Sequence, residues 1–316
     1  MAATRRHALL GFLVVGIAAC TPMPTTPSPT IAPTATATVV PSSSPTGRYP
    51  VLIVRVEDVD VLHWYVTSSA DPSQRRRLAA PPGDVELGPA ATDGTVPLTV
   101  GSSLLLAALR GDDLTIERTI DLGRLGIAAS TPACLGPGPR VAVADHEALA
   151  LTVVAADGPA VPVTAPDALG ECAWLDDGRL LLDREGDRLA VADAGTGTVH
   201  VVSGGSGRHP STGGGLIALV DRSGHTAVVV LDGDLGGPDG TVLGSPRFTI
   251  DPAPDELISR AQLSPDGGWL AVEAILAPEG DALRRLRLYE IASGVPVSKV
   301  EIPLGPGEQV VILPTR

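Results

Sequence analysis

Short apolar runs alternate with turn residues along residues 48–316 of this chain. The runs are rich in Val, Leu and Ala, and clusters of Gly, Pro and Asp separate them. No part of this region shows a convincing helical period, in which apolar residues would recur every three or four positions. Short strands bounded by Gly, Pro and Asp turns are typical of all-β domains. The pattern therefore predicts one all-β domain over residues 48–316.

Several of these runs resemble one another. LAVADAGTGTVHVVSGG (189–205) aligns without a gap with IALVDRSGHTAVVVLDG (217–233), each as an apolar strand, a Gly or Asp turn and a second strand. Similar hairpins begin at residues 51, 104, 141 and 270. The six starting points lie on average about 44 residues apart, the length of one four-stranded propeller blade. The domain therefore has the length of a single β-propeller with six four-stranded blades.

One hairpin carries a family signature. AQLSPDGGWLAV (261–272), followed by LYEIASG (288–294), resembles the LSPDGxxLA…LYxxxxG blade of TolB-like and WD40-like (PD40-type) propellers. Ser264-Pro265-Asp266-Gly267 suits a type I or II turn, because proline fixes φ at the first corner and glycine closes the turn. The resemblance implies that this turn joins the innermost strand of a blade to the next one. A β-sandwich or a split barrel with a chance turn of this kind is the alternative fold.

A different pattern precedes the β domain. The positive residues 5–7 (Arg-Arg-His) are followed by an apolar stretch, Leu9 to Ala19, which is too short to cross a bilayer as a mature helix. It ends in Ile17-Ala18-Ala19-Cys20, which resembles the lipobox of bacterial lipoproteins. The resemblance implies that residues 1–19 are a signal peptide and that Cys20 carries a diacylglycerol. The alternative is an ordinary secretory signal in which the cysteine is incidental.

The segment after Cys20 suits an anchored protein. Residues 21–47 consist almost entirely of Pro, Thr, Ser and Ala, with no charged and no aromatic residue. Such a composition cannot build a core, so residues 20–47 are expected to form a disordered, partly polyproline-II tether. A disordered remnant without a spacer role would have the same structure. If Cys20 is lipidated, the chain attaches to the extracytoplasmic face of the cell membrane.

Composition limits the classes of partner. The formal charge of the chain is −13, and removal of Arg5 and Arg6 leaves 21 basic against 36 acidic residues, a charge of −15. This charge argues against a nucleic-acid partner and favours a basic envelope protein or a cation. The chain has no asparagine and only eight aromatic residues, so an aromatic stacking platform for bases or sugars is hard to assemble.

Two cysteines remain after Cys20. Cys134 and Cys172 are 38 residues apart, about one blade, and each precedes an equivalent strand of neighbouring repeats. In an oxidising compartment this placement favours a disulfide between the first strands of adjacent blades. Counted back from the following strands, however, the two cysteines differ by one position, which would turn them to opposite faces. Two buried free thiols are the alternative.

Candidate chemistry is sparse. Asp232, Asp234 and Asp239 lie within eight residues of a Gly-rich turn that could wrap Ca²⁺, although a solvated hairpin loop is the simpler interpretation. No other cofactor is expected. The histidines show no metal-ligand spacing; these are His63, His200, His209 and His225. His146-Glu147 begins like a zinc-protease helix but continues as strand-like sequence, and Gly204–Gly207 lacks the spacing of a nucleophile elbow.

These observations favour a membrane-anchored lipoprotein that presents a non-catalytic propeller for binding a protein or a small ligand, with no catalytic residues assigned. The alternative is a propeller hydrolase or lyase, similar to the lactonases, that uses carboxylates at the mouth of the channel. The Glu/Asn/Asp calcium cluster of such enzymes cannot be completed in a chain without asparagine. Convergence of Asp and Glu from several blades at one end of the channel would favour the enzyme.

Overall fold

The computed structural model describes residues 50–315 with short gaps, and Cys20, the predicted signal peptide and the tether lie outside the described residues. The gaps are residues 59–60, 69, 80–84, 111–112, 128–130, 137–139, 146–149, 156–158, 164–167, 176–177, 185, 222–226, 236–242, 277–282, 292–294 and 306–307. No helix in the described residues is long and apolar enough to cross a membrane.

Within the described residues, strands form six four-stranded antiparallel sheets. The first sheet contains β24 (Glu308–Thr315), β1 (Pro50–Asp58), β2 (Val61–Ser68) and β3 (Asp71–Arg77). The second contains β4 (Val85–Leu87), β5 (Thr95–Val100), β6 (Ser103–Arg110) and β7 (Asp113–Asp121), and a 3-10 turn, η1 (Gly123–Leu125), follows it. The third contains β8 (Thr131–Leu135), β9 (Arg140–Asp145), β10 (Ala150–Ala155) and β11 (Val161–Val163).

The remaining sheets follow the same order along the chain. The fourth contains β12 (Ala168–Trp174), β13 (Arg179–Arg184), β14 (Arg188–Asp193) and β15 (Val199–Ser206). The fifth contains β16 (Arg208–Gly213), β17 (Leu216–Asp221), β18 (Ala227–Asp232) and β19 (Phe248–Ile250). The sixth contains β20 (Glu256–Leu263), β21 (Trp269–Leu276), β22 (Leu283–Glu290) and β23 (Val297–Leu304).

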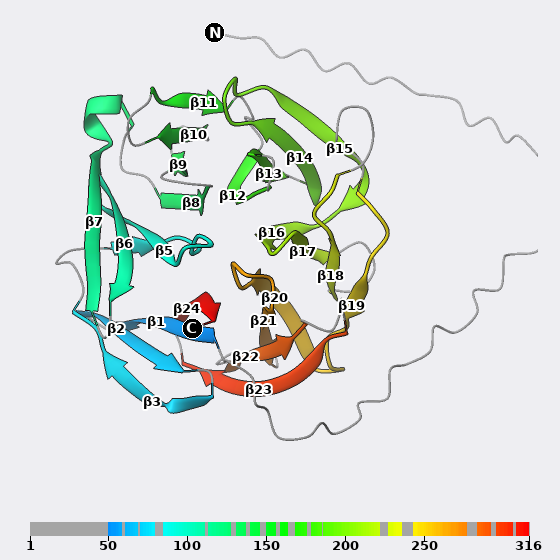
Figure 1. Cartoon of the computed structure of the whole chain (residues 1–316). Coiled ribbons are helices and arrows are strands. Elements are labelled where there is room, and N and C mark those ends of the chain that lie inside the picture. Colours follow the sequence, from blue (N-terminus) through cyan, green and yellow to red (C-terminus); the bar gives the residue numbers. More distant parts are fainter. Residues whose placement is uncertain are drawn as a thin grey trace, which may run out of the picture. The chain divides into compact units, whose positions relative to one another are not determined.

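The sheets are arranged as a ring around a central axis (Figure 1), which is a β-propeller. The first strand of each sheet is innermost, and the inner strands of neighbouring sheets contact one another, as β8, β12, β16 and β20 do. The last strand, β24, pairs with β1 and so joins the two ends of the chain in one sheet. The predicted all-β class and single propeller are confirmed, and the sandwich and split-barrel alternatives are excluded.

The hydrophobic core is divided among the contacts between neighbouring sheets. One buried cluster of the described residues, for example, joins Ala142 and Leu151 of the third sheet to Leu180 and Ala190 of the fourth. Equivalent clusters lie at each of the other contacts around the ring, including the one that joins β1 and β24 to β4–β6. The Val, Leu and Ala runs therefore form strands whose two faces pack against two different neighbours, which explains why few strands show a strict alternation.

The six predicted hairpins are all pairs of consecutive strands, but not equivalent pairs. Those at 51, 141, 217 and 270 are the second and third strands of their sheets, whereas those at 104 and 189 are the third and fourth. The gap-free alignment of 189–205 with 217–233 is therefore wrong by one strand. A buried strand, a turn and another buried strand give the same local pattern wherever they lie in a sheet, so the sequence does not distinguish the two positions.

The Ser-Pro-Asp-Gly turn connects β20 to β21, as the resemblance implied. Gly267 N donates to Ser264 O (2.8 Å), and Gly267 has a φ of +69°, which favours glycine. Asp266 is not among the described residues with positive φ, so the turn is type I rather than type II. The buried Ser264 Oγ accepts a hydrogen bond from Trp269 N (2.9 Å), which fixes the start of the next strand.

Candidate functional site

A cavity of about 60 Å³ is lined by the innermost strands of the propeller, and we call it the axial cavity. Residues of β8, β12, β16 and β20 line it, together with Pro89 and Ala90, which follow β4. The polar side chains of its wall include Glu171, His209 and Arg260.

Three side chains that could bind a metal ion meet at this cavity. Glu171 (β12), Asp183 (β13) and His209 (β16) each offer one nitrogen or oxygen, and these three atoms lie within 4.8 Å of one another. Glu171 and His209 line the cavity, whereas Asp183 lies behind them and is only 1% exposed. We refer to these three residues as the axial triad.

Irregular strand pairing places the triad. Between Ala168 and Cys172, the register of β12 against β13 shifts, and Glu171 lies in this irregular segment. A second shift, between Arg208 and Ser211 of β16, contains His209. His209 also has a φ of +52°, an uncommon backbone conformation for a residue with a side chain. Bulges of this kind turn side chains away from the regular pleat, and they are frequent next to functional sites.

Hydrogen bonds connect the three residues. His209 N donates to Asp183 Oδ2 (3.2 Å), and His209 Nδ1 is in hydrogen-bond contact with Glu171 Oε2. The other oxygen of Asp183, Oδ1, is buried and has no hydrogen-bond partner among the described residues. A buried acceptor without a partner costs about 1–3 kcal/mol, so this oxygen is an energetic defect unless something binds it.

The electrostatics of the two carboxyl groups differ. Burial raises the pKa of Asp183 to about 6, against weaker opposing effects of His209 and Arg208. Burial also acts to raise the pKa of Glu171, but the His209 hydrogen bond and the charges of Arg260, His209 and Arg208 outweigh it and lower that pKa. Arg208 is itself in an ion pair with Asp187. The site therefore contains one readily ionised carboxylate and one that ionises near neutral pH.

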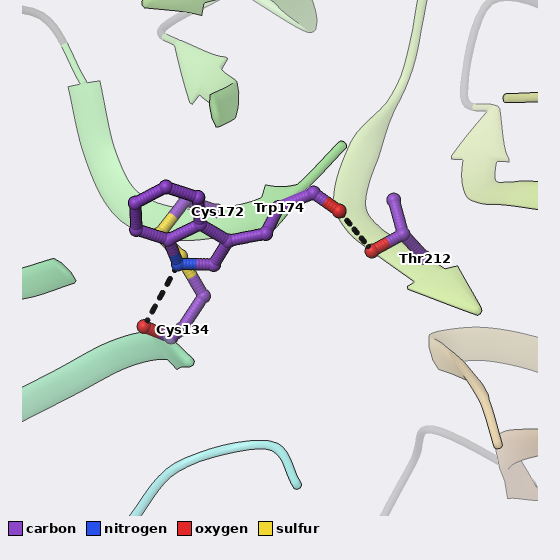
Figure 2. The surroundings of a disulfide bond; sticks show 4 residues. All are labelled: Cys134, Cys172, Trp174 and Thr212. Atoms are coloured by element: carbon purple, nitrogen blue, oxygen red, sulfur yellow. Dashed lines mark hydrogen bonds between the residues drawn. A yellow bond between two sulfur atoms is a disulfide. The ribbon is translucent and has the colours of Figure 1, made fainter. Parts of the chain in front are cut away.

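A disulfide lies beside this site (Figure 2). Cys134 of β8 and Cys172 of β12 are bonded, with their Cα atoms 5.7 Å apart, so the predicted bridge between the first strands of adjacent sheets is present. The predicted one-residue difference in register is also present, since Cys134 pairs with Ala142 and Cys172 with Leu182. Both cysteines lie directly after a register shift in their strands. Such shifts change the direction of the side chains that follow, and this explains how the two sulfur atoms can bond despite the difference in register.

Trp174 packs over the disulfide, as Figure 2 shows. Its Nε1 donates to Cys134 O (3.3 Å), and its own carbonyl accepts from Thr212 Oγ1 (2.6 Å). Gly136 lies against the ring so closely that a Cβ there would be 2.6 Å from Trp174 Cε2. Trp174 also lines a second hollow of about 160 Å³, which Thr212, Gly214 and Pro265 help to form. Trp174 thus connects the third sheet through its indole and the fifth sheet through its backbone carbonyl, beside the cavity.

The other site residues predicted from the sequence are either distant from the triad or not among the described residues. Asp232 and Asp234 are exposed, Asp232 forms an ion pair with Arg247 (3.5 Å), and Asp239 lies outside the described residues. The calcium loop thus stays a prediction. His200 is exposed on β15, whereas the side chain of His63 and all of His146, Glu147 and His225 are not described.

Sequence reasoning missed the triad. It set His209 aside for lack of metal-ligand spacing and did not single out Glu171 or Asp183. The three residues come from two neighbouring sheets, and the two that are furthest apart in sequence, Glu171 and His209, are separated by 38 positions. One signal was present: Asp183 directly follows three leucines that form a buried strand, and a charged residue in such a place is unusual.

Comparisons with known proteins add the following. No family model matches this chain. No curated protein matches it. Among solved structures, it is similar to the β-propeller domain of Cps50 (Swd1) from Myceliophteria thermophila, with 15% identity, a TM-score of 0.49 and coverage of 86% of this chain and 89% of that one. It is also similar to a protein from Lactobacillus plantarum, with 14% identity, a TM-score of 0.47 and coverage of 85% and 100%.

Proposed function

We propose that this protein is an envelope lipoprotein of the TolB-like (PD40) propeller type that binds a small polar ligand in its axial cavity. The observation that carries the binding role is the cavity itself, whose wall combines an acidic, an imidazole and a basic side chain: Glu171, His209 and Arg260. The disulfide and Trp174 brace the same wall, so the polar groups are held on a rigid frame before any ligand arrives.

The membrane anchor is supported by the sequence that ends in Cys20 and by the uncharged segment after it. Intact mass spectrometry of protein extracted from membranes with detergent is expected to show a chain that begins at residue 20 and carries a diacylglycerol. Cys20→Ala protein is expected in the soluble fraction or as the unprocessed precursor. A mature N-terminus elsewhere, without lipid mass, would refute the anchor and leave the binding role of the cavity untouched.

Ligand binding is tested on the full-length chain in detergent by thermal shift. The probes are amino acids, hexoses, dicarboxylic acids and dipeptides, because a mixed acidic and basic wall suits small polar or zwitterionic compounds. At least one probe is expected to raise the Tm of the wild type, with a smaller rise for Glu171→Gln and Arg260→Gln. His200→Gln, an exposed change outside the cavity, serves as the matched control. A shift that persists in both cavity variants would contradict the proposal.

A propeller hydrolase or lyase is the second candidate. The observation in its favour is a pair of carboxyl groups beside an imidazole, one of which has a pKa of about 6. Both carboxyl groups, however, come from the fourth sheet, whereas convergence from several sheets was the feature expected of the enzyme. Lactone, ester and phosphoester panels are expected to show no turnover above background. Hydrolysis that disappears in Glu171→Gln would promote the enzyme over the binding role.

A further inference from the structure

We infer that Glu171, Asp183 and His209 form a binding site for one divalent transition-metal ion, for which Zn²⁺ is the best match, with open coordination positions toward the axial cavity. The inference deepens the proposed binding role, because it names the chemical class of one ligand of the same cavity, and it rests on that cavity. It does not depend on the membrane anchor.

The distances suit a metal ion after a small adjustment. An ion held at about 2.0–2.2 Å by three tetrahedrally placed donors needs those donors roughly 3.4 Å apart. The donor atoms of the triad lie within 4.8 Å of one another, so a contraction of up to about 1.4 Å at their outer limit is sufficient. The side chains of Glu171 and His209 are 40% and 23% exposed, which leaves them room to move.

The unpartnered oxygen of Asp183 is an independent observation that points to a ligand. Asp183 is 1% exposed, its Oδ2 accepts from His209 N, and its Oδ1 has no hydrogen-bond partner in the part of the chain that the structure describes. A carboxylate with one oxygen held by a backbone N–H and the other bare has the arrangement of an oriented metal ligand. A cation at this position would compensate Oδ1 for the water that it loses on burial. Without such a partner, burial of this carboxylate would only cost free energy.

The donor set discriminates among metals. One imidazole nitrogen and two carboxylate oxygens suit Zn²⁺, and also Mn²⁺ or Fe²⁺, whereas Ca²⁺ requires six to eight oxygen ligands. Three protein ligands leave at least one coordination position, as in catalytic zinc sites. Since Glu171 and His209 line the cavity, such a position would face it and could accept water or a polar group of a ligand.

Two arginines bear on the charge of the site. Arg208 forms an ion pair with Asp187, and Arg260 lies in the cavity wall. The charges of both arginines act on Glu171, the charge of Arg260 more strongly. Arg260 therefore opposes the binding of a cation while the two carboxylates favour it. Removal of the Arg260 charge should therefore raise the affinity for the metal ion, whereas removal of any residue of the axial triad should lower it.

The test is calorimetric titration of the full-length, EDTA-treated chain in detergent with ZnCl₂, and separately with MnCl₂, CaCl₂ and MgCl₂. We expect one equivalent of Zn²⁺, and a Kd for Zn²⁺ far below those for Ca²⁺ and Mg²⁺. Asp183→Asn and His209→Asn should each weaken Zn²⁺ binding by at least about 10-fold, since even groups that only orient metal ligands contribute 10- to 100-fold. Asparagine is chosen at position 209 because it tolerates positive φ better than most residues.

Two further variants complete the design. Arg260→Gln should bind Zn²⁺ more tightly, and His200→Gln, an exposed histidine of β15, should bind as the wild type does. Near-UV circular dichroism checks that each variant is folded. The inference is overturned if the wild type binds no Zn²⁺, if binding survives unchanged in both folded ligand variants, or if Ca²⁺ binds more tightly than Zn²⁺. Thermal-shift results with organic probes bear on the proposed function alone, so the two failures can be told apart.

Discussion

The Cys134–Cys172 disulfide allows a quantitative prediction of stability. The perturbation is the double variant Cys134→Ala/Cys172→Ala, which removes the bond without leaving an unpaired thiol. The two cysteines are 38 residues apart. In the chain-entropy model, closing a loop of this size lowers the entropy of the unfolded chain and so raises the free energy of unfolding by about 4 kcal/mol at 25 °C. Both cysteines are buried, so the lost sulfur contacts add to the effect.

The assay is equilibrium unfolding of the full-length chain in urea, with the free energy of unfolding extrapolated to water. Reduced wild type is expected to lose about 4 kcal/mol relative to the oxidised wild type, and the double variant should lose more, because it also loses the sulfur contacts. Reduction keeps both side chains, so it isolates the covalent bond from the change in packing. The hydrogen bond from Trp174 to Cys134 uses a backbone carbonyl and survives in both samples. A loss below about 1 kcal/mol in the reduced protein would refute the argument.

Three further predictions concern Gly136 and Thr212 beside the site and the buried Tyr289 of β22. Gly136→Ala would place a Cβ 2.6 Å from Trp174 Cε2 and is expected to destabilise the fold by about 1–3 kcal/mol in urea unfolding. Gly244→Ala should be neutral, because no atom of the described residues other than its chain neighbours lies within 4 Å of the new Cβ. Thr212→Val removes the hydrogen bond to Trp174 O and should cost about 1 kcal/mol, while Thr212→Ser should retain most of it; equal losses would contradict this role. Burial raises the pKa of the Tyr289 phenol above its ordinary value near 10, so the folded state prefers the neutral form; its contribution to stability is complete below about pH 10 and is lost as the pH rises through the folded pKa. The Tm of Tyr289→Phe should therefore fall less between pH 9 and 11 than that of the wild type, and parallel curves would count against the prediction.

The fold could be predicted because its signals are local. Strand and turn alternate within every few residues, and Ser264-Pro265-Asp266-Gly267 encodes its own turn. The spacing of Cys134 and Cys172 matched one repeat, which was enough to pair them. The strand alignment failed where local pattern is ambiguous, since the β14–β15 and β17–β18 hairpins look alike although they occupy different places in their sheets.

The site could not be predicted because it depends on irregularities that residue propensities do not encode. Glu171 and His209 lie in register shifts, and His209 adopts a positive φ that its residue type does not require. In regular strands the side chains of Glu171 and His209 would point to alternate faces in a way that sequence position predicts. The residues between them carry no pattern that predicts that β12 and β16 line the same cavity. Asp183 is the exception, since a carboxylate at the end of three buried leucines is an anomaly that sequence alone displays.

The pairing of β24 with β1 has a mechanical consequence. β1 is the first described strand after the N-terminal segment, so tension applied through that segment reaches β1 before any other strand. β1 is hydrogen-bonded along both edges, to β2 and to β24, and Arg55 adds a side-chain contact to Gln309, 254 residues away. Extracting β1 would require rupture of two ladders at once, whereas a strand at a sheet edge could be peeled from one. A protein tethered by its N-terminus would thus carry its load on a strand that is hydrogen-bonded on one edge to β2 and on the other to the last described strand, β24.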